Sequence, residues 1–120
     1  MTILGIHHIE LTVKNLEISK KFYEKLPGFK VVAQYPNFIM FFNSYFYLGL
    51  TDHKNKQTAD KFLETNVGMD HASLLVKSKD DLDEGQKLFG GEIKKLSNNL
   101  WVLAFRDPDN IQLELCWKEK

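Results

Sequence analysis

Hydrophobic and polar side chains alternate along residues 4–13, near the start of the chain. Ile9 and Leu11 fall on one side of this stretch, whereas His8 and Glu10 fall on the other. Such alternation is typical of a strand that buries only one of its faces. It predicts that His8 and Glu10 lie side by side on the polar face.

After this strand the apolar residues recur at helical spacing, and Asn15 precedes them in the position of an N-cap. Pro27 and Gly28 break the pattern, so the sequence predicts a helix over about 15–26. Three segments rich in aromatic and β-branched residues follow and are predicted to be strands, at 29–34, 38–43 and 45–51. The predicted unit is β-α-β-β-β.

The second half of the chain repeats this order. When His8 is placed on His71, an offset of 63 (71 − 8), Gly28 falls on Gly91 without a gap. In the last strand of each half, Glu114 falls on Gly49 at an offset of 65 (114 − 49). One half therefore ends with a carboxylate where the other has no side chain.

The second half is predicted to begin with a strand near His71. Ser78 and Asp81 resemble a capping box at the start of a second helix, which two glycines at 90–91 end. The remaining strands are predicted at 91–96, 100–105 and 111–117, with a tight turn at 107–110 before the last of them.

These patterns predict an α+β fold of two tandem βαβββ modules. The modules are expected to form a cup-shaped, curved mixed sheet with the helices on the outside. We expect one domain over 1–120, with module one at about 4–51, a connector at 52–67 and module two at about 68–117. A chain of 120 residues is the size of one ordinary domain.

Composition and charge limit the kinds of binding partner and the cellular compartment that we expect. Sixteen basic and sixteen acidic residues cancel, and the basic residues form no run or stripe, which argues against nucleic acid. Cys116 is the single cysteine, so it cannot form an internal disulfide. No apolar stretch approaches the length of a membrane span, and the first residues lack a signal pattern. We therefore expect a cytoplasmic protein without a membrane partner.

Three residues with metal-ligating side chains share the non-core face by strand parity: His8, His71 and Glu114. Two neutral imidazoles and one carboxylate suit a divalent ion of intermediate hardness such as Mn²⁺, Fe²⁺, Co²⁺, Ni²⁺ or Zn²⁺. Three protein ligands leave coordination positions for water or substrate, which is typical of a catalytic site. The alternative is that each histidine is a core or surface residue that only forms hydrogen bonds.

With these residues in place, the sequence resembles the vicinal oxygen chelate superfamily. That superfamily includes glyoxalase I, extradiol dioxygenases, fosfomycin-resistance transferases, methylmalonyl-CoA epimerase and bleomycin-resistance proteins. The resemblance covers essentially the whole chain. It depends on the paired modules, on HHIELTV at 7–13, on the glycine breaks after each helix, and on FRDPDNIQLEL at 105–115.

The resemblance implies that metal ligands come from the first and fourth strands of each module. In this chain those positions are His8, Gly49, His71 and Glu114. Gly49 cannot ligate, so the match is closer to members with two histidines and one glutamate than to glyoxalase I, which uses all four positions.

Further residues are candidates for the same face. Glu10 is interpreted as a proton-transferring base, an extra ligand, a carboxylate that orients His71, or a residue that simply pairs with a lysine. By parity four residues are expected to line the cup, where they would bind substrate or pack: Tyr45, Tyr47, Ser73 and Gln112. His7 has the opposite parity and is expected to be structural or exposed. For Arg106 we favour a salt bridge to Asp107 or Asp109 over binding a substrate carboxylate.

The first hypothesis is a small metal-dependent enzyme of lyase, isomerase or dioxygenase type, with Glu10 and Glu114 as catalytic residues. Its metal would hold two oxygens of a small substrate and stabilise an anionic intermediate. The rival hypothesis is a metal-free protein that sequesters a small aromatic or cationic compound, as bleomycin-resistance proteins do. One curved module cannot close on itself, so two modules must pair. The resemblance implies that in short relatives module one of one chain often pairs with module two of another, and we therefore expect a homodimer with sites shared between chains.

Overall fold

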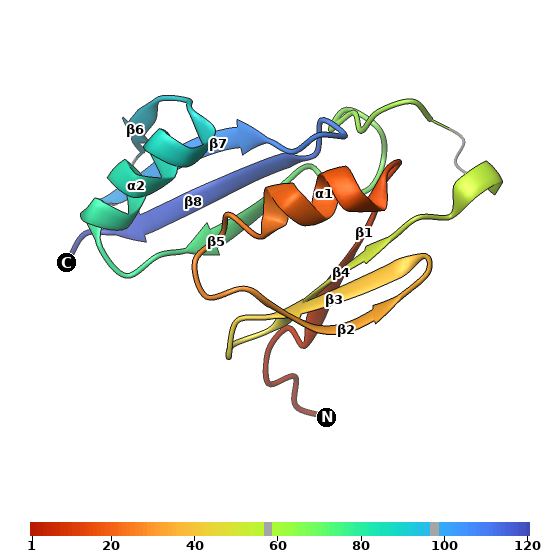
Figure 1. Ribbon diagram of the computed structural model, residues 1–120. Helices are drawn as coiled ribbons and strands as arrows, with labels where there is room; N and C mark the ends of the chain where they lie inside the picture. Colours follow the sequence, from red (N-terminus) through yellow and green to blue (C-terminus); the bar gives the residue numbers. More distant parts are fainter. Residues whose placement is uncertain (57–58, 97–98) are drawn as a thin grey trace. The chain divides into compact units, whose positions relative to one another are not determined.

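The computed structural model describes residues 1–56, 59–96 and 99–120, and it confirms the two βαβββ modules (Figure 1). The chain divides into two compact units, which we call unit 1 (Met1–Asp60) and unit 2 (Lys61–Lys120). The boundary falls inside the connector predicted at 52–67, of which residues 57 and 58 lie outside the described ranges. Each unit holds a helix and a four-stranded mixed sheet, so the α+β fold class is also confirmed.

Unit 1 contains one helix and four strands: β1 (His8–Thr12), α1 (Leu16–Tyr23), β2 (Lys30–Tyr35), β3 (Phe38–Phe42) and β4 (Tyr47–Thr51). Its sheet has the order β1-β4-β3-β2. The first and last strands, β1 and β4, are parallel neighbours, whereas the other pairs are antiparallel. A short 3₁₀ turn, η1 (Lys54–Lys56), follows β4.

Helix α1 begins as predicted, because Asn15 Oδ1 accepts a hydrogen bond from the Ile18 amide at 3.0 Å. It ends earlier than predicted, at Tyr23 instead of residue 26. The amides of Lys25 and Leu26 bond to the third preceding carbonyl, each at 3.1 Å, so the last turn tightens. Pro27 then disfavours the helical conformation at Leu26.

Two predicted strands of unit 1 are also shorter than expected. Strand β1 begins at His8 instead of residue 4, and β4 begins at Tyr47 instead of residue 45. Before β4, the Asn43 side-chain oxygen accepts the amides of Tyr45 and Phe46 at 2.9 and 3.0 Å. This local turn replaces the sheet pairing expected for Tyr45, whose side chain is exposed.

Unit 2 repeats the arrangement, with β5 (Ala72–Leu75), α2 (Lys79–Phe89), β6 (Ile93–Lys95), β7 (Leu100–Arg106) and β8 (Gln112–Lys118). The sheet order is β5-β8-β7-β6, again with parallel first and last strands. At the start of α2, the Asp81 carboxylate accepts the Ser78 amide at 3.0 Å. In the turn before β8, Asp107 Oδ1 accepts the amides of Asp109 and Ile111, both at 2.8 Å.

The strand register confirms the internal repeat residue by residue. In unit 1 Glu10 lies opposite Gly49, and in unit 2 Ser73 lies opposite Glu114. These are equivalent pairs, because 73 − 10 gives the offset of 63 and 114 − 49 gives the offset of 65. Gly49 and Glu114 therefore occupy the same place in their two sheets.

Each helix packs on one face of the sheet in its own unit, α1 against β3 and β4, and α2 against β6, β7 and β8. The buried strand residues alternate with more exposed ones, as the sequence predicted; they include Leu11, Ile39, Phe41, Leu50, Leu103, Leu113 and Leu115. The alternating positions on the opposite face carry His8, Glu10, Ser73 and Glu114. No described helix is long and apolar enough to cross a membrane.

Candidate metal centre

Unit 2 brings together two of the predicted ligands. His71 lies just before β5 and Glu114 lies on β8, the neighbouring strand. Their Nε2 and Oε1 atoms are 3.6 Å apart, which is too long for a hydrogen bond. Two ligands each about 2.1 Å from one ion lie roughly 3.0–3.6 Å apart when the angle between them is about 90–120°. The spacing of this pair therefore fits two neighbouring ligands of one ion.

Asp70 fixes the orientation of the His71 ring. The Asp70 carboxylate accepts a hydrogen bond from His71 Nδ1 at 2.7 Å, which leaves the Nε2 lone pair facing Glu114. This hydrogen bond raises the pKa of His71, and the charge of Glu114 adds to the effect, whereas partial burial opposes it. A histidine held at Nδ1 by a carboxylate is a common arrangement in metal sites, because it sets the tautomer that the metal requires.

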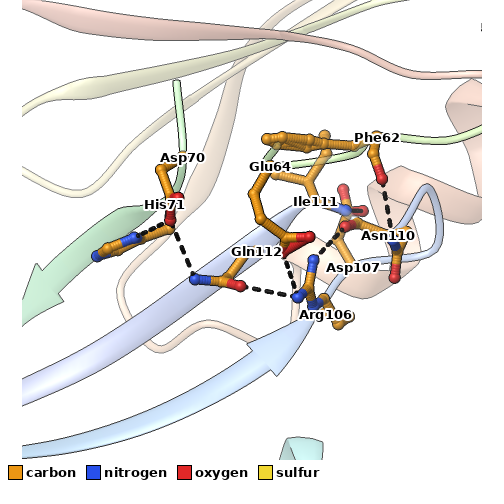
Figure 2. A network of polar contacts seen from close by, with 9 residues as sticks. All are labelled: Phe62, Glu64, Asp70, His71, Arg106, Asp107, Asn110, Ile111 and Gln112. Atoms are coloured by element: carbon orange, nitrogen blue, oxygen red, sulfur yellow. Dashed lines mark hydrogen bonds and ion pairs between the residues drawn. The ribbon is translucent and has the colours of Figure 1, made fainter. Parts of the chain in front are cut away.

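Asp70 is itself part of a longer polar network in unit 2 (Figure 2). Gln112 lies between Asp70 and Arg106: its amide nitrogen donates to Asp70 at 3.4 Å and its oxygen accepts from Arg106 at 2.7 Å. Arg106 also pairs with Glu64 and donates to the Asn110 carbonyl at 3.1 Å. Arg106 therefore forms a salt bridge, as predicted, and Glu64 of the connector is a partner in it.

Sequence reasoning did not single out Asp70 or Glu64. Asp70 had a usable signal, since it directly precedes a candidate ligand and a carboxylate there can reach the imidazole. Glu64 had none, because it lies in the unpatterned connector. The backbone of that segment is attached to the turn before β8, where Phe62 N–H donates to the Asp109 carbonyl at 2.8 Å.

Unit 1 contains a corresponding histidine and carboxylate. His8 Nε2 and Glu10 Oε1 are 3.8 Å apart, and the Nδ1 atoms of His7 and His8 are 2.9 Å apart. When His8 is the donor in that contact, its Nε2 lone pair faces Glu10. The His7 ring also stacks on Tyr47 at 4.9 Å. His7 thus contacts Nδ1 of His8, the same ring atom through which Asp70 contacts His71.

Of the other predicted site residues, two lie next to a proposed ligand in the sheet and one does not. Tyr47 is opposite His8 and Ser73 is opposite Glu114, each on the face away from the helix, whereas Tyr45 lies in the turn before β4. Across residues 1–56, 59–96 and 99–120, no group of three or more His, Cys, Asp or Glu side chains is placed to hold a metal ion. Each unit places one candidate histidine beside a carboxylate on a strand, His8 beside Glu10 in unit 1 and His71 beside Glu114 in unit 2.

The sequence profile of the Glyoxalase/Bleomycin resistance protein/Dioxygenase superfamily matches residues 5–115. The chain belongs to this superfamily. A superfamily domain from Frankia sp. EAN1pec is 31% identical, with a TM-score of 0.86 over 98% of this chain and 100% of that one. The present chain therefore has the fold of this superfamily.

Two superfamily structures named for an activity or a resistance are more distant. Lactoylglutathione lyase from Agrobacterium tumefaciens is 19% identical, with a TM-score of 0.76 over 97% of this chain and 95% of that one. The fosfomycin resistance protein FosX from Listeria monocytogenes is 21% identical, with a TM-score of 0.71 over 98% and 96%. At these identities the two structures establish the shared fold alone, which hosts more than one function.

Proposed function

We propose that this superfamily member is a divalent-metal-dependent enzyme acting on a small oxygen-rich molecule, with His8, His71 and Glu114 as metal ligands. The observation that carries the proposal is the His71–Glu114 pair, whose 3.6 Å spacing suits an ion better than a direct hydrogen bond. Asp70 supports the same conclusion, because it presents the Nε2 lone pair of His71 toward Glu114.

The proposed reaction is of lyase, isomerase or dioxygenase type. When bound, an ion such as Mn²⁺, Fe²⁺, Co²⁺, Ni²⁺ or Zn²⁺ supplies Lewis-acid stabilisation of negative charge on substrate oxygens. We expect the hydroxyls of Ser73 and Tyr47 to orient substrate, which is supported by the strand register, where each residue lies opposite a proposed ligand. Tyr45 and Gln112 remain candidates, although the Gln112 amide already contacts Asp70 and Arg106.

We also propose a two-fold homodimer in which each site takes His8 from one chain and His71 with Glu114 from its partner. This proposal is supported by the strand order, because β1 and β5, which carry or adjoin the proposed histidine ligands, are edge strands of their own sheets. Edge strands expose unpaired backbone groups and therefore favour an additional neighbour. A closed two-fold assembly would give two equivalent sites.

The test is a titration of purified protein with Zn²⁺ or Co²⁺, followed by calorimetry. Wild-type protein is expected to bind one ion per chain, and Glu114→Gln should lose tight binding while remaining folded, because it replaces a charged ligand with a neutral amide of the same shape. The matched control is Glu84→Gln, on the exposed side of α2, which should bind as wild type does. Wild-type protein that binds no divalent ion would refute the proposed function.

A metal-free binding function is the second candidate, and one observation favours it. On the helix-free face of unit 1, Tyr47 stacks on Phe42 at 4.4 Å and on His7 at 4.9 Å, which forms an aromatic surface. Such a surface suits a small aromatic or cationic compound. Protein that binds these compounds tightly but lacks metal after purification without a chelator would favour sequestration over catalysis.

A further inference from the structure

Gly49 occupies the place in unit 1 that Glu114 occupies in unit 2, but the space above it is not empty. A Cβ atom built on Gly49 would lie 3.0 Å from Glu10 Cγ and 3.2 Å from Phe38 Cε1. Both contacts are tighter than a side chain normally makes. Glu10 and Gly49 are direct neighbours in the parallel pair of β1 and β4, so the Glu10 side chain leans across the strand boundary onto Gly49.

The carboxylate that leans over Gly49 has the same relation to its histidine as Glu114 has in unit 2. Glu10 Oε1 is 3.8 Å from His8 Nε2, and Glu114 Oε1 is 3.6 Å from His71 Nε2. Both distances exceed a hydrogen bond; the distance in unit 2 falls at the upper end of the spacing of two ligands on one ion, and the distance in unit 1 lies just beyond it. In unit 1 the carboxylate beside the histidine is Glu10, which comes from β1, whereas in unit 2 it is Glu114, which comes from β8.

We propose that Glu10 is a fourth metal ligand, which replaces from the neighbouring strand the carboxylate that Gly49 cannot supply. This inference depends on the proposed metal-binding function and extends its ligand set to two histidines and two glutamates. Glycine at position 49 is then required by packing, because a larger residue would displace the Glu10 stem. Glu10 keeps a half-exposed side chain, so its carboxylate is free to adjust toward an ion.

The contacts of Glu10 fit metal ligation better than the two other roles considered for it, pairing with a lysine and orienting an imidazole. A surface pair with a lysine would leave the approach to His8 unexplained; Lys14, on the same segment, lies 4.0 Å from Asp60. A carboxylate that only orients an imidazole would contact its Nδ1 or Nε2 directly, as Asp70 does at 2.7 Å, and not stand 3.8 Å away. The distance and the placement over Gly49 both favour ligation.

The experiment moves the carboxylate between the two strands. Four proteins are titrated with Zn²⁺ and Co²⁺ alone: wild type, Glu10→Gln, the double variant Glu10→Ala/Gly49→Glu, and the control Glu17→Gln on exposed α1. Removing the Glu10 stem relieves the closer of the two tight contacts at position 49, the one at 3.0 Å, so that only the Phe38 ring at 3.2 Å has to shift. Folding of each protein is verified by circular dichroism and urea denaturation.

Glu10→Gln is expected to weaken metal binding by about 100-fold or more, because the loss of a direct ligand should cost at least as much as the upper end of the loss for an outer-shell partner. The double variant should recover affinity to within about tenfold of wild type, since the carboxylate returns from β4. The visible spectrum of bound Co²⁺ should change in Glu10→Gln and return in the double variant, because it reports the number and geometry of ligands. The Glu17→Gln control should be unchanged.

The outcomes separate this inference from the proposed function. If Glu10→Gln binds metal as wild type does while Glu114→Gln does not, Glu10 is not a ligand and the proposed function stands. A folded double variant that fails to recover affinity likewise overturns the replacement of position 49 by Glu10. If wild-type protein binds no divalent ion, the metal-dependent function fails and this inference fails with it.

Discussion

Replacing Asp70 by asparagine tests how much the orientation of His71 contributes to metal binding. Asparagine keeps the shape of the side chain and an oxygen that can accept from His71 Nδ1, but it removes the negative charge from a contact of 2.7 Å. It also changes the contact with Gln112, the next residue of the network. We expect weaker metal binding in a protein that remains folded.

The size of the effect follows from the exposure of the pair. Loss of an outer-shell partner typically costs about 10–100-fold in metal affinity. The side chains of His71 and Asp70 are 38% and 64% exposed, so solvent screens their interaction and the lower end applies. A tenfold loss corresponds to about 1.4 kcal/mol of binding free energy.

The pH dependence of this difference has a definite sign. Asp70 raises the pKa of His71, and a proton on His71 competes with the metal for Nε2. In Asp70→Asn the pKa of His71 falls, so competition by protons weakens. The loss of affinity should therefore be fully visible well above the wild-type pKa of His71, and it should shrink as the pH falls below it.

The assay is calorimetric titration with Zn²⁺ at pH 8 and pH 6. The control is Asp83→Asn, which removes the same charge from α2 in the same unit, where Asp83 pairs with Lys79 at 3.6 Å. Nitrogen NMR of His71 in the metal-free protein should also report a weaker preference for the Nδ1–H tautomer. Unchanged affinity at pH 8 in folded Asp70→Asn protein would refute the reasoning.

Two further predictions concern packing and assembly. Gly85→Ala should lower the free energy of unfolding in urea by about 1–2 kcal/mol, because its Cβ would lie 2.5 Å from Leu115 Cδ1 and overpacking outweighs the gain of about 1 kcal/mol in helix propensity; equal or higher stability would contradict this. Mixing His8→Ala with Glu114→Gln, under conditions of proven subunit exchange, should restore tight metal binding at one of the two sites of each mixed dimer. No recovery would exclude sites shared between chains.

Much of the fold was predictable because the periodicity of each segment and the internal repeat agreed. The capping residue Asn15 and the Asp107 turn were both visible as local sequence signals, and each makes the hydrogen bonds expected of it. The errors lie at element ends, where local geometry overrides the pattern. Asn43 binds two backbone amides and delays β4, although the residues from Tyr45 onward have high strand propensity.

The candidate site was predictable only as far as strand parity reaches. Parity placed His8 and Glu10 on one face of module one, and the same argument placed Ser73 and Glu114 on the corresponding face of module two. It could not show that Glu10 leans over Gly49, because that depends on the register between β1 and β4 and on the side-chain conformation. Contacts with the connector, such as Arg106 with Glu64, have no periodic signal at all.

The parallel pairing of the first and last strands in each unit also bears on how the chain folds as it is synthesised. The backbone of β1 cannot pair with β4 until β4 has been synthesised, and the same holds for β5 and β8. Such distant pairings form late, since a long loop must close before they are stabilised. Until then β5 presents an open edge beside Leu75, which is 74% exposed even in the finished fold. The nascent second module therefore needs protection from aggregation until β8 has emerged.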